Sequence, residues 1–469
     1  MQQYKHRQLD IDFQLTNNML TARRIMENIP ADIIPIMNQV ITLLGYKYLS
    51  QNLKNNKEDL GYELHEDSYY ENLLIDKGNV IDTLKRGIEQ ITQENENTQA
   101  ADIFYDLFNL VDFDTFKDNE TWLLLIEIVE RLCSGTIATL GEIMIFLTKY
   151  VNELKLDPKI KGTPTIKPTY DIIELMTINQ NDVKNIYDPY ADEATLLAEI
   201  GNVISVENYY GQHPNIEKCI LAKMTLLTND VNYKNIFIKC NDITEPIHWN
   251  VKFDICVSIP PFRSFSERKN RKSFNDADER FKPYVPKRFN ELAYILDMLY
   301  HLNENGTVKI LVPPGVISSP SDKNILKYLV DNELISSIIA LSDKLYGKPR
   351  IPTVLLIINK KLVNKGIYYL NMTNAKIKIL PSEMTSIENI DEYDELLANK
   401  TEKELISKTA TLDDIQENNY NLGINRYVDL VKLEMIDVEK TISNIEEINM
   451  ELEEVDEELN EKIISLFKN

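Results

Sequence analysis

The segment from Val251 to Phe262 reads Val-Lys-Phe-Asp-Ile-Cys-Val-Ser-Ile-Pro-Pro-Phe, so a β-branched strand runs directly into two prolines and an aromatic ring. In a pocket that presents a flipped base for methyl transfer to its exocyclic amine, a side-chain oxygen and the following proline carbonyl accept hydrogen bonds from the amine, while the ring stacks on the base. Here Ile259 occupies the acceptor position and offers no oxygen, and Ser258 points away by strand alternation. We therefore interpret four residues as a base pocket without its catalytic acceptor: Ile259, Pro260, Pro261 and Phe262.

Three turns that follow predicted strands are candidates for binding an adenosyl cofactor, because ligands of a doubly wound sheet lie beyond the carboxyl ends of its strands. The first turn has no glycine, although close approach of backbone to ligand normally needs glycine. Its Asp192 and Glu193 would face the carboxylate end of S-adenosylmethionine. His213 could bond a ribose hydroxyl or be structural, and Asp242 could accept from the adenine amine or cap a turn. The candidates in these turns are Asp188, Pro189, Tyr190, Ala191, Asp192, His213 and Asp242.

The elements that must position these residues differ along the chain. Residues 1–155 predict an α-helical domain, because apolar residues recur at three- and four-residue spacing over Ile33–Leu49, Trp122–Leu132 and Ile137–Tyr150. Residues 156–375 alternate short apolar runs with helical stretches, which predicts an α/β domain with a mostly parallel, doubly wound sheet and helices on both faces. Residues 376–429 are polar, and we expect an irregular connecting segment there. The predicted strands are Asn185–Tyr187, Ser205–Gly211, Ile236–Lys239, Phe253–Ser258, Thr307–Val312, Ile335–Leu341, Thr353–Asn359 and Gly366–Asn371; the helices between them include Leu196–Ile200, Asn215–Thr228, Glu291–Leu302 and Lys323–Asn332.

Composition limits the class of protein. The chain has 469 residues, 43% of them apolar, which is enough for two or three domains with a large core. It contains no apolar run of membrane-spanning length and no signal-type stretch near its start. Its four cysteines form no CxxC pair, so we expect no disulfide framework and no metal site, and we expect a cytoplasmic protein.

The charge of the chain is unevenly distributed. A net charge of −23 argues against a free-standing nucleic-acid binder, because phosphate contacts supply most of that affinity. The segment from residue 263 to residue 272 nevertheless carries five basic residues and one acid, immediately after the Pro-Pro-Phe. We interpret it as a DNA-binding segment, with a solvated face as the alternative. Its basic residues are Arg263, Arg268, Lys269, Arg271 and Lys272.

The last part of the chain, residues 430–469, predicts one long coiled-coil helix. Apolar residues step by three and four from Val438 to Leu466, and from residue 439 onward ten acids face three lysines. So narrow an apolar stripe is marginal alone in water and needs a partner surface. We expect a second subunit to supply it, with packing on the chain's own body as the alternative.

These pieces resemble, in order and spacing, the modification (M) subunit of type I restriction–modification systems, a family of S-adenosylmethionine-dependent adenine-N6 DNA methyltransferases. The resemblance covers nearly the whole chain. It implies a Rossmann-like class I methyltransferase domain between a helical domain and a C-terminal helix that packs against the specificity (S) subunit. It also implies a restriction (R) subunit and DNA as partners. The matching runs include Leu43–Ser50, Asp106–Phe108, Tyr210–Gln212, Asp278–Phe281, Val312–Val316, Ile351–Thr353 and Asn419–Leu422.

Departures from the family pattern cluster where the chemistry should be. The family's Asp-Pro-x-Cys-Gly-Ser-Gly is a glycine-free run from Asp188 to Ala194, and its ribose acid is His213. The aromatic-Tyr-Thr-Pro that covers the cofactor ends here in Lys167 and Pro168, which the resemblance adds to the cofactor-binding candidates. The family's Asn-Pro-Pro-Phe begins here with Ile259. We therefore expect S-adenosylmethionine binding to be weakened or abolished.

Three functions follow from this pattern. The leading hypothesis is a catalytically inactive M-subunit homologue that acts as a scaffold or regulatory partner of an S-type subunit and DNA. The second is an active adenine methyltransferase in which the Pro260 carbonyl and Asp242 manage the amine. The third is an acidic protein-interaction module that has lost DNA binding.

Overall fold

The computed structural model describes nine longer stretches of the chain and several short pieces. They are residues 2–55, 60–93, 98–155, 168–245, 249–262, 291–346, 350–361, 366–379 and 385–429, with 247, 274, 278–282, 284–287, 448–450, 452 and 455. The chain divides into two compact units, Met1–Val428 and Asp429–Asn469. None of the described helices is long and apolar enough to cross a membrane.

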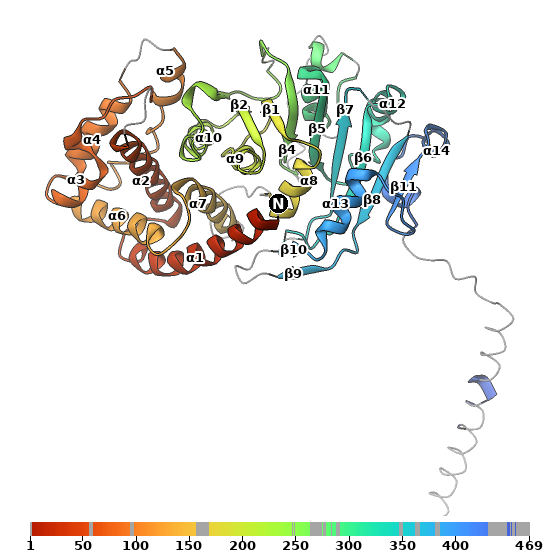
Figure 1. Ribbon diagram of the computed structural model, residues 1–469, viewed down its shortest axis with the longest axis horizontal. Helices are drawn as coiled ribbons and strands as arrows, with labels where there is room; N and C mark the ends of the chain where they lie inside the picture. Colours follow the sequence, from red (N-terminus) through yellow and green to blue (C-terminus); the bar gives the residue numbers. More distant parts are fainter. Residues whose placement is uncertain are drawn as a thin grey trace, which may run out of the picture. The chain divides into compact units, whose positions relative to one another are not determined.

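The first part of the larger unit is helical, as predicted (Figure 1). Helix α2 (Ile33–Lys54) is buried on most of its surface. Its Gly45 lies so close to α10 (Ile216–Thr228) that a Cβ there would come within 2.6 Å of Met224 Sδ. Lys223 of α10 also pairs with Asp106 at 2.7 Å. The helical part and the sheet therefore meet at α10. Its helices are α1 (Gln2–Met26), α2 (Ile33–Lys54), α3 (Tyr70–Ile75), α4 (Val80–Ile91), α5 (Thr98–Phe104), α6 (Asn119–Cys133) and α7 (Leu140–Leu154).

A nine-stranded sheet forms the rest of this unit, in the order β11-β8-β6-β7-β5-β4-β1-β2-β3. The pairs among β3, β2, β1, β4 and β5 are parallel, whereas β7 runs antiparallel between β5 and β6, and β11 runs antiparallel to β8. The predicted α/β class with a doubly wound sheet is confirmed. The strands are β1 (Asp182–Asp188), β2 (Ser205–His213), β3 (Ile236–Cys240), β4 (Phe253–Ser258), β5 (Leu302–Val312), β6 (Ile335–Leu341), β7 (Thr353–Asn359), β8 (Ile367–Met372) and β11 (Ser407–Ala410).

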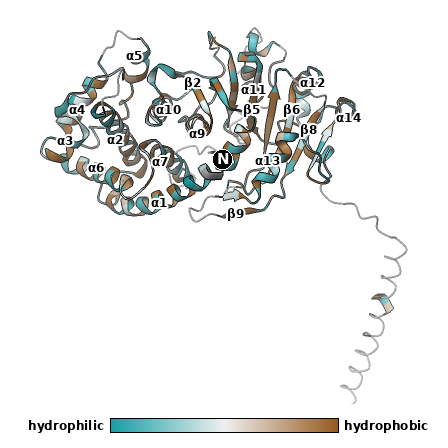
Figure 2. Cartoon of the chain, in the orientation of Figure 1, coloured by the Kyte–Doolittle hydropathy of each residue, from teal (hydrophilic) through white to brown (hydrophobic). Residues whose placement is uncertain are grey.

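Alternation along the strands assigns their side chains to two apolar layers, and the central strands are coloured hydrophobic in Figure 2. Ile186, Ile255 and Val257 share one buried cluster with α8, α9 and α10, whereas Tyr187 and Cys256 belong to the cluster of α11 and α12. A strand buried on both faces carries apolar residues at successive positions, such as Ile186 with Tyr187 and Ile255 with Cys256, and this made these strands predictable. The covering helices are α8 (Tyr170–Thr177), α9 (Thr195–Gly201), α10 (Ile216–Thr228), α11 (Glu291–His301) and α12 (Lys323–Asp331).

Residues 376–429 are not irregular, and that expectation was wrong. Helix α13 (Ile390–Asn399) buries Ile390, Leu396 and Leu397, and β11 extends the sheet beside β8. An edge strand and a surface helix need few apolar residues, so their polar sequences concealed them. The remaining elements there are β9 (Ile377–Ile379), β10 (Thr385–Ile387) and α14 (Leu412–Glu417).

A buried ionic cluster joins α11 to the loop before it. The Arg280 side chain is fully buried and donates to Asp278 and, at 2.9 Å, to Asp297, which also accepts from the Tyr187 hydroxyl. Burial alone would raise the pKa of Asp297, but hydrogen bonding and charge from His301 and Arg280 outweigh it and lower that pKa. The loop is thus fixed to the sheet by charges that depend on one another.

Replacing Arg280 by methionine should lower the free energy of unfolding by about 3 to 5 kcal/mol, because it leaves two buried carboxylates without their cation. Denaturant unfolding measures the change. The matched control is Lys282→Met, which removes an exposed cation that pairs with Glu279. That variant should leave the unfolding midpoint nearly unchanged, because water and salt screen an exposed ion pair. Equal losses in the two variants would contradict this account of the cluster.

Candidate functional site

Strand order reverses between β1 and β4, and their carboxyl ends lie side by side at this point. The Ser258 hydroxyl at the end of β4 donates to Asp188 Oδ1 at the end of β1, over 2.8 Å. The same carboxylate oxygen accepts from the Tyr190 backbone N–H at 2.8 Å. The Ser258 hydroxyl therefore already donates its hydrogen to Asp188. This buried hydrogen bond joins the ends of β1 and β4 where the strand order reverses.

The turn from Asp188 to Ala194 retains a backbone suited to glycine. Asp192 has φ 49° and Ala194 has φ 58°, both in the left-handed region that L-residues adopt at a cost. These are the two positions at which the resembled M-subunit motif carries glycine. Gly211 of β2 allows the turn to pack closely, since a Cβ there would come within 2.8 Å of the Ala191 Cβ. The turn thus has left-handed backbone conformations suited to glycine, but it carries side chains at both positions.

Those side chains are held by a lysine that the sequence did not single out. Lys218, in the first turn of α10, pairs with Asp192 at 2.8 Å and with Glu193. Glu193 is 2% exposed, so the pair is largely shielded from water. Asn215 caps α10 by accepting from the Lys218 backbone N–H, which fixes the start of the helix. The two carboxylates thus share one cation within the protein.

His213, at the position of the ribose acid, packs against aromatic rings. Its ring lies 4.6 Å from that of Tyr190, edge to face, and Tyr190 in turn lies 5.9 Å from Tyr294. The His213 Nδ1 accepts from the Asn215 backbone N–H at 3.1 Å. An imidazole whose Nδ1 is an acceptor can offer only a donor at Nε2, the opposite polarity to a carboxylate.

Asp242 forms the turn that the sequence left open as one alternative. Its Oδ1 accepts from both the backbone N–H and the hydroxyl of Thr244, at 3.0 and 2.6 Å. An acceptor role toward an adenine amine stays a prediction.

Gln212, which precedes His213 in β2, is a further polar residue that the sequence did not indicate. It is 1% exposed, and its amide oxygen and nitrogen have no hydrogen-bond partner among the described residues.

The base-pocket candidates follow β4 directly. Ile259 is 7% exposed and belongs to the same apolar cluster as Ile255 and Val257. Pro260 is buried, and Phe262 is half-buried against that cluster. Lys167 lies outside the described residues, and so do the five basic residues predicted to bind DNA, Arg263, Arg268, Lys269, Arg271 and Lys272.

One group of carboxylates lies away from this edge. Glu174, Asp391 and Asp394 place oxygen atoms within 4.8 Å of one another. Burial, followed by the charge and hydrogen bond of Glu174, raises the pKa of Asp394 to about 8. A proton held between the two carboxyls accounts for their closeness without a metal ion.

A family model described as N-6 DNA Methylase matches residues 166–435, which is more than half of the chain. The chain belongs to the N-6 DNA methylase family. Among its relatives is the methylase subunit of the type I restriction enzyme MpnII of Mycoplasma pneumoniae, 25% identical over 87% of this chain and 88% of the relative. The predicted resemblance to type I M subunits is confirmed.

Solved structures of this family share the fold. The methyltransferase subunit of a type I restriction–modification system from Streptococcus thermophilus has a TM-score of 0.71 at 20% identity, over 89% of this chain and 100% of that one. A chain from a structure on complex assembly and conformational transition of a type I restriction–modification system has a TM-score of 0.62 at 13% identity, over 96% and 98%. At such identities the likeness shows architecture alone, so the altered site residues must be judged by their own chemistry.

The left-handed conformation of Ala194 predicts unequal effects of one substitution at two sites. Ala194→Gly and Ala198→Gly each remove a buried methyl group and each loosen the unfolded chain, but Ala198 lies inside helix α9. Only Ala194→Gly relieves left-handed strain. It should therefore cost about 1 to 2 kcal/mol less than Ala198→Gly in the free energy of unfolding, measured by chemical denaturation. Equal costs would show that the turn is unstrained.

Proposed function

We propose that this chain is a catalytically silent N-6 DNA methylase homologue that acts as a scaffold or regulatory partner of an S-type specificity subunit on DNA. The observation that carries the proposal is the environment of Ile259. The residue that should accept from the target amine is an aliphatic side chain, 7% exposed, within an apolar cluster. The neighbouring hydroxyl, that of Ser258, is already donated to Asp188.

The missing acceptor affects both binding and chemistry. A buried N–H of the base left unpaired costs about 1 to 3 kcal/mol in binding. The amine becomes more positive as it attacks the methyl donor, so an absent acceptor matters more in the transition state. Loss of one preorganised polar group of this kind costs about 10² to 10³ in rate.

The residues of the first turn do not fit S-adenosylmethionine. Asp192 and Ala194 project side chains where the family motif has glycine, and Asp192 and Glu193 are tied to Lys218. His213 presents a donor where the ribose hydroxyls need an acceptor. These features support loss of the cofactor.

A scaffold role is supported by the C-terminal unit. Of the predicted apolar stripe, Ile448, Leu452 and Val455 are helical, and each is more than half exposed. The relatives are methylase subunits of type I restriction enzymes, which act within assemblies. We assign the stripe to contact with an S-type subunit, and the basic segment after Phe262 to contact with DNA, with an R subunit as a further member of the complex.

An active adenine methyltransferase is the competing function. Its support is the turn itself, which keeps both left-handed conformations without glycine. In that case the Pro260 carbonyl and Asp242 would have to hold the amine between them.

Transfer of methyl groups to adenine should be undetectable, and Ile259→Asn alone should not restore it. The substitution repairs the base pocket but leaves the cofactor turn unchanged. Recovery should need Ile259→Asn together with the family's glycine-containing sequence at Tyr190 to Ala194. The assay is transfer of labelled methyl groups to DNA in the presence of an S-type subunit.

The control is the glycine-containing turn alone, which should bind S-adenosylmethionine in a calorimetric titration yet remain inactive. Methylation by the unaltered chain would sink the proposal in favour of the active enzyme. Low-micromolar binding of S-adenosylmethionine by the unaltered chain would refute the part that concerns the cofactor.

Truncation after Val428 should leave a folded body, because Met1–Val428 is a compact unit, but remove association with an S-type subunit. The full-length variant with Ile445→Glu and Leu452→Glu should lose about 2 kcal/mol or more of binding free energy for each anchor. Its control carries Asn444→Glu and Asn449→Glu, which add the same charge beside the stripe. Coelution of the truncated chain with the partner would show that the stripe is not the contact.

A further inference from the structure

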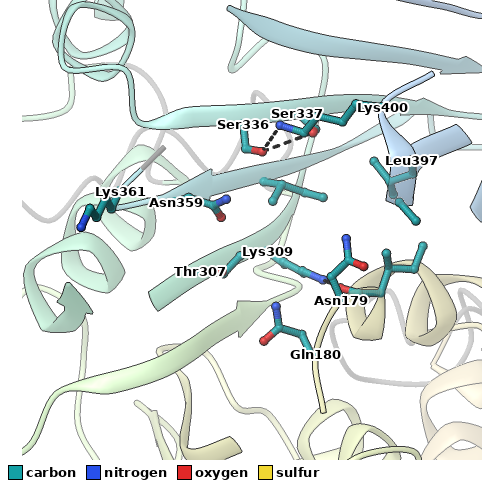
Figure 3. A pocket seen from close by; sticks show the side chains of 13 residues that line it. Asn179, Gln180, Thr307, Lys309, Ser336, Ser337, Asn359, Lys361, Leu397 and Lys400 are labelled. Carbon is teal, nitrogen blue, oxygen red and sulfur yellow. Dashed lines mark hydrogen bonds between the residues drawn. The ribbon is translucent and has the colours of Figure 1, made fainter. Parts of the chain in front are cut away.

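A cavity of about 310 Å³ lies apart from the candidate site at the ends of β1 and β4. Its walls come from the middle of β5, the start of β6, the end of β7, the turn after α8 and the end of α13 (Figure 3). Thr307 in the middle of β5 pairs with Asn359, the last residue of β7, and Ser336 and Ser337 lie at the start of β6. This cavity is therefore separate from Asp188 and Ile259, which lie at the carboxyl ends.

The charge of the cavity is opposite to that of the chain. Lys309, Lys361 and Lys400 line it, and none of its described lining residues carries a carboxylate. The whole chain has a net charge of −23, so a concave site lined by three lysines stands out. Low-dielectric walls focus the field of such a group and attract anions.

Lys309 is the innermost of the three cations. It is 2% exposed and lies on β5, and its Nζ donates to the Ile178 carbonyl at 2.7 Å. A protonated amine has three donors, and this bond uses one of them. Burial lowers the pKa of Lys309 to about 7. A buried lysine of this kind gains its full charge when an anion is placed beside it.

Neutral polar groups complete the lining. Lys400 Nζ donates to the Ser336 hydroxyl at 3.0 Å, and the Ser337 hydroxyl lies 3.5 Å from that of Ser336 (Figure 3). The Asn359 Oδ1 is buried and has no hydrogen-bond partner among the described residues. The cavity thus offers several donors to an anion, and the Asn359 oxygen can accept from a hydroxyl group.

We propose that this cavity binds a small phosphate-bearing anion, with Lys309 and Lys400 contacting the phosphate and Asn359 accepting from a hydroxyl of the ligand. Lysine binds phosphate as a point charge, and serine hydroxyls donate to its oxygens. The volume admits a phosphate with a small organic part and excludes a nucleic-acid duplex. This site is independent of methyl transfer and of the C-terminal stripe.

The test is calorimetric titration of the full chain with inorganic phosphate and, separately, with adenosine monophosphate. Lys309→Met and Lys400→Met should each weaken binding about tenfold or more, because each removes a charge-assisted hydrogen bond. The control is Lys360→Met: this neighbour pairs with Glu304 and donates to the Leu302 carbonyl, and it does not line the cavity. Thermal unfolding of each variant verifies that the fold is intact.

A second measurement uses sulfate, whose charge is constant across neutral pH. Its affinity should fall as pH rises from about 6 to 8, because Lys309 loses its proton in that range, and Lys309→Met should abolish this dependence. Tighter binding of the nucleotide than of phosphate identifies a nucleotide as the ligand, and equal binding identifies free phosphate. Absence of binding by all three anions, or unchanged binding in both the Lys309 and the Lys400 variants, would overturn the proposal.

Discussion

The hydrogen bond between Ser258 and Asp188 lies at the point where the strand order of the sheet reverses. It joins the ends of β1 and β4, the two strands between which the order of the sheet reverses. A parallel sheet brings loops from distant parts of the chain to this single edge. The turn after Asp188, the His213 turn and the segment after Ser258 can meet only because these two strand ends are fixed side by side.

The turn after Asp188 combines a backbone conformation suited to glycine with charged side chains. Asp192 and Ala194 have left-handed backbones, and Lys218 pairs with both Asp192 and Glu193. An unbalanced pair of acids in so buried a turn would destabilise it, so Asp192, Glu193 and Lys218 form one unit. Ile259, in the candidate base pocket, packs into the apolar layer that contains Ile255 and Val257. Both the Lys218 pairs and the packing of Ile259 therefore stabilise this edge of the sheet.

The sequence predicted the strands well and the contacts of polar side chains poorly. Phe253–Ser258, Ile335–Leu341 and Thr353–Asn359 agree with the structure at both ends, because strands buried on two faces are rich in apolar residues over a short run. The pairing of Lys218 with Asp192 links residues 26 positions apart, and no local pattern encodes it. Positive φ at Ala194 was equally hidden, since alanine gives no sign of it. The spacing of the motifs selected the candidate residues. The ion pairs among them depend on tertiary contacts that no local spacing reveals.

Helix α10 gives the structure a mechanical property. Its first turn holds the cofactor-like turn through Lys218, and further along Lys223 and Met224 contact the helical part at Asp106 and Gly45. A helix transmits displacement along its axis with little bending, and these contacts lie within two turns of one another. The contact of α10 with α2 at Gly45 therefore lies less than two helical turns from the pairs of Lys218 with the turn after Asp188. Helix α10 thus connects the helical part directly to the turn after Asp188.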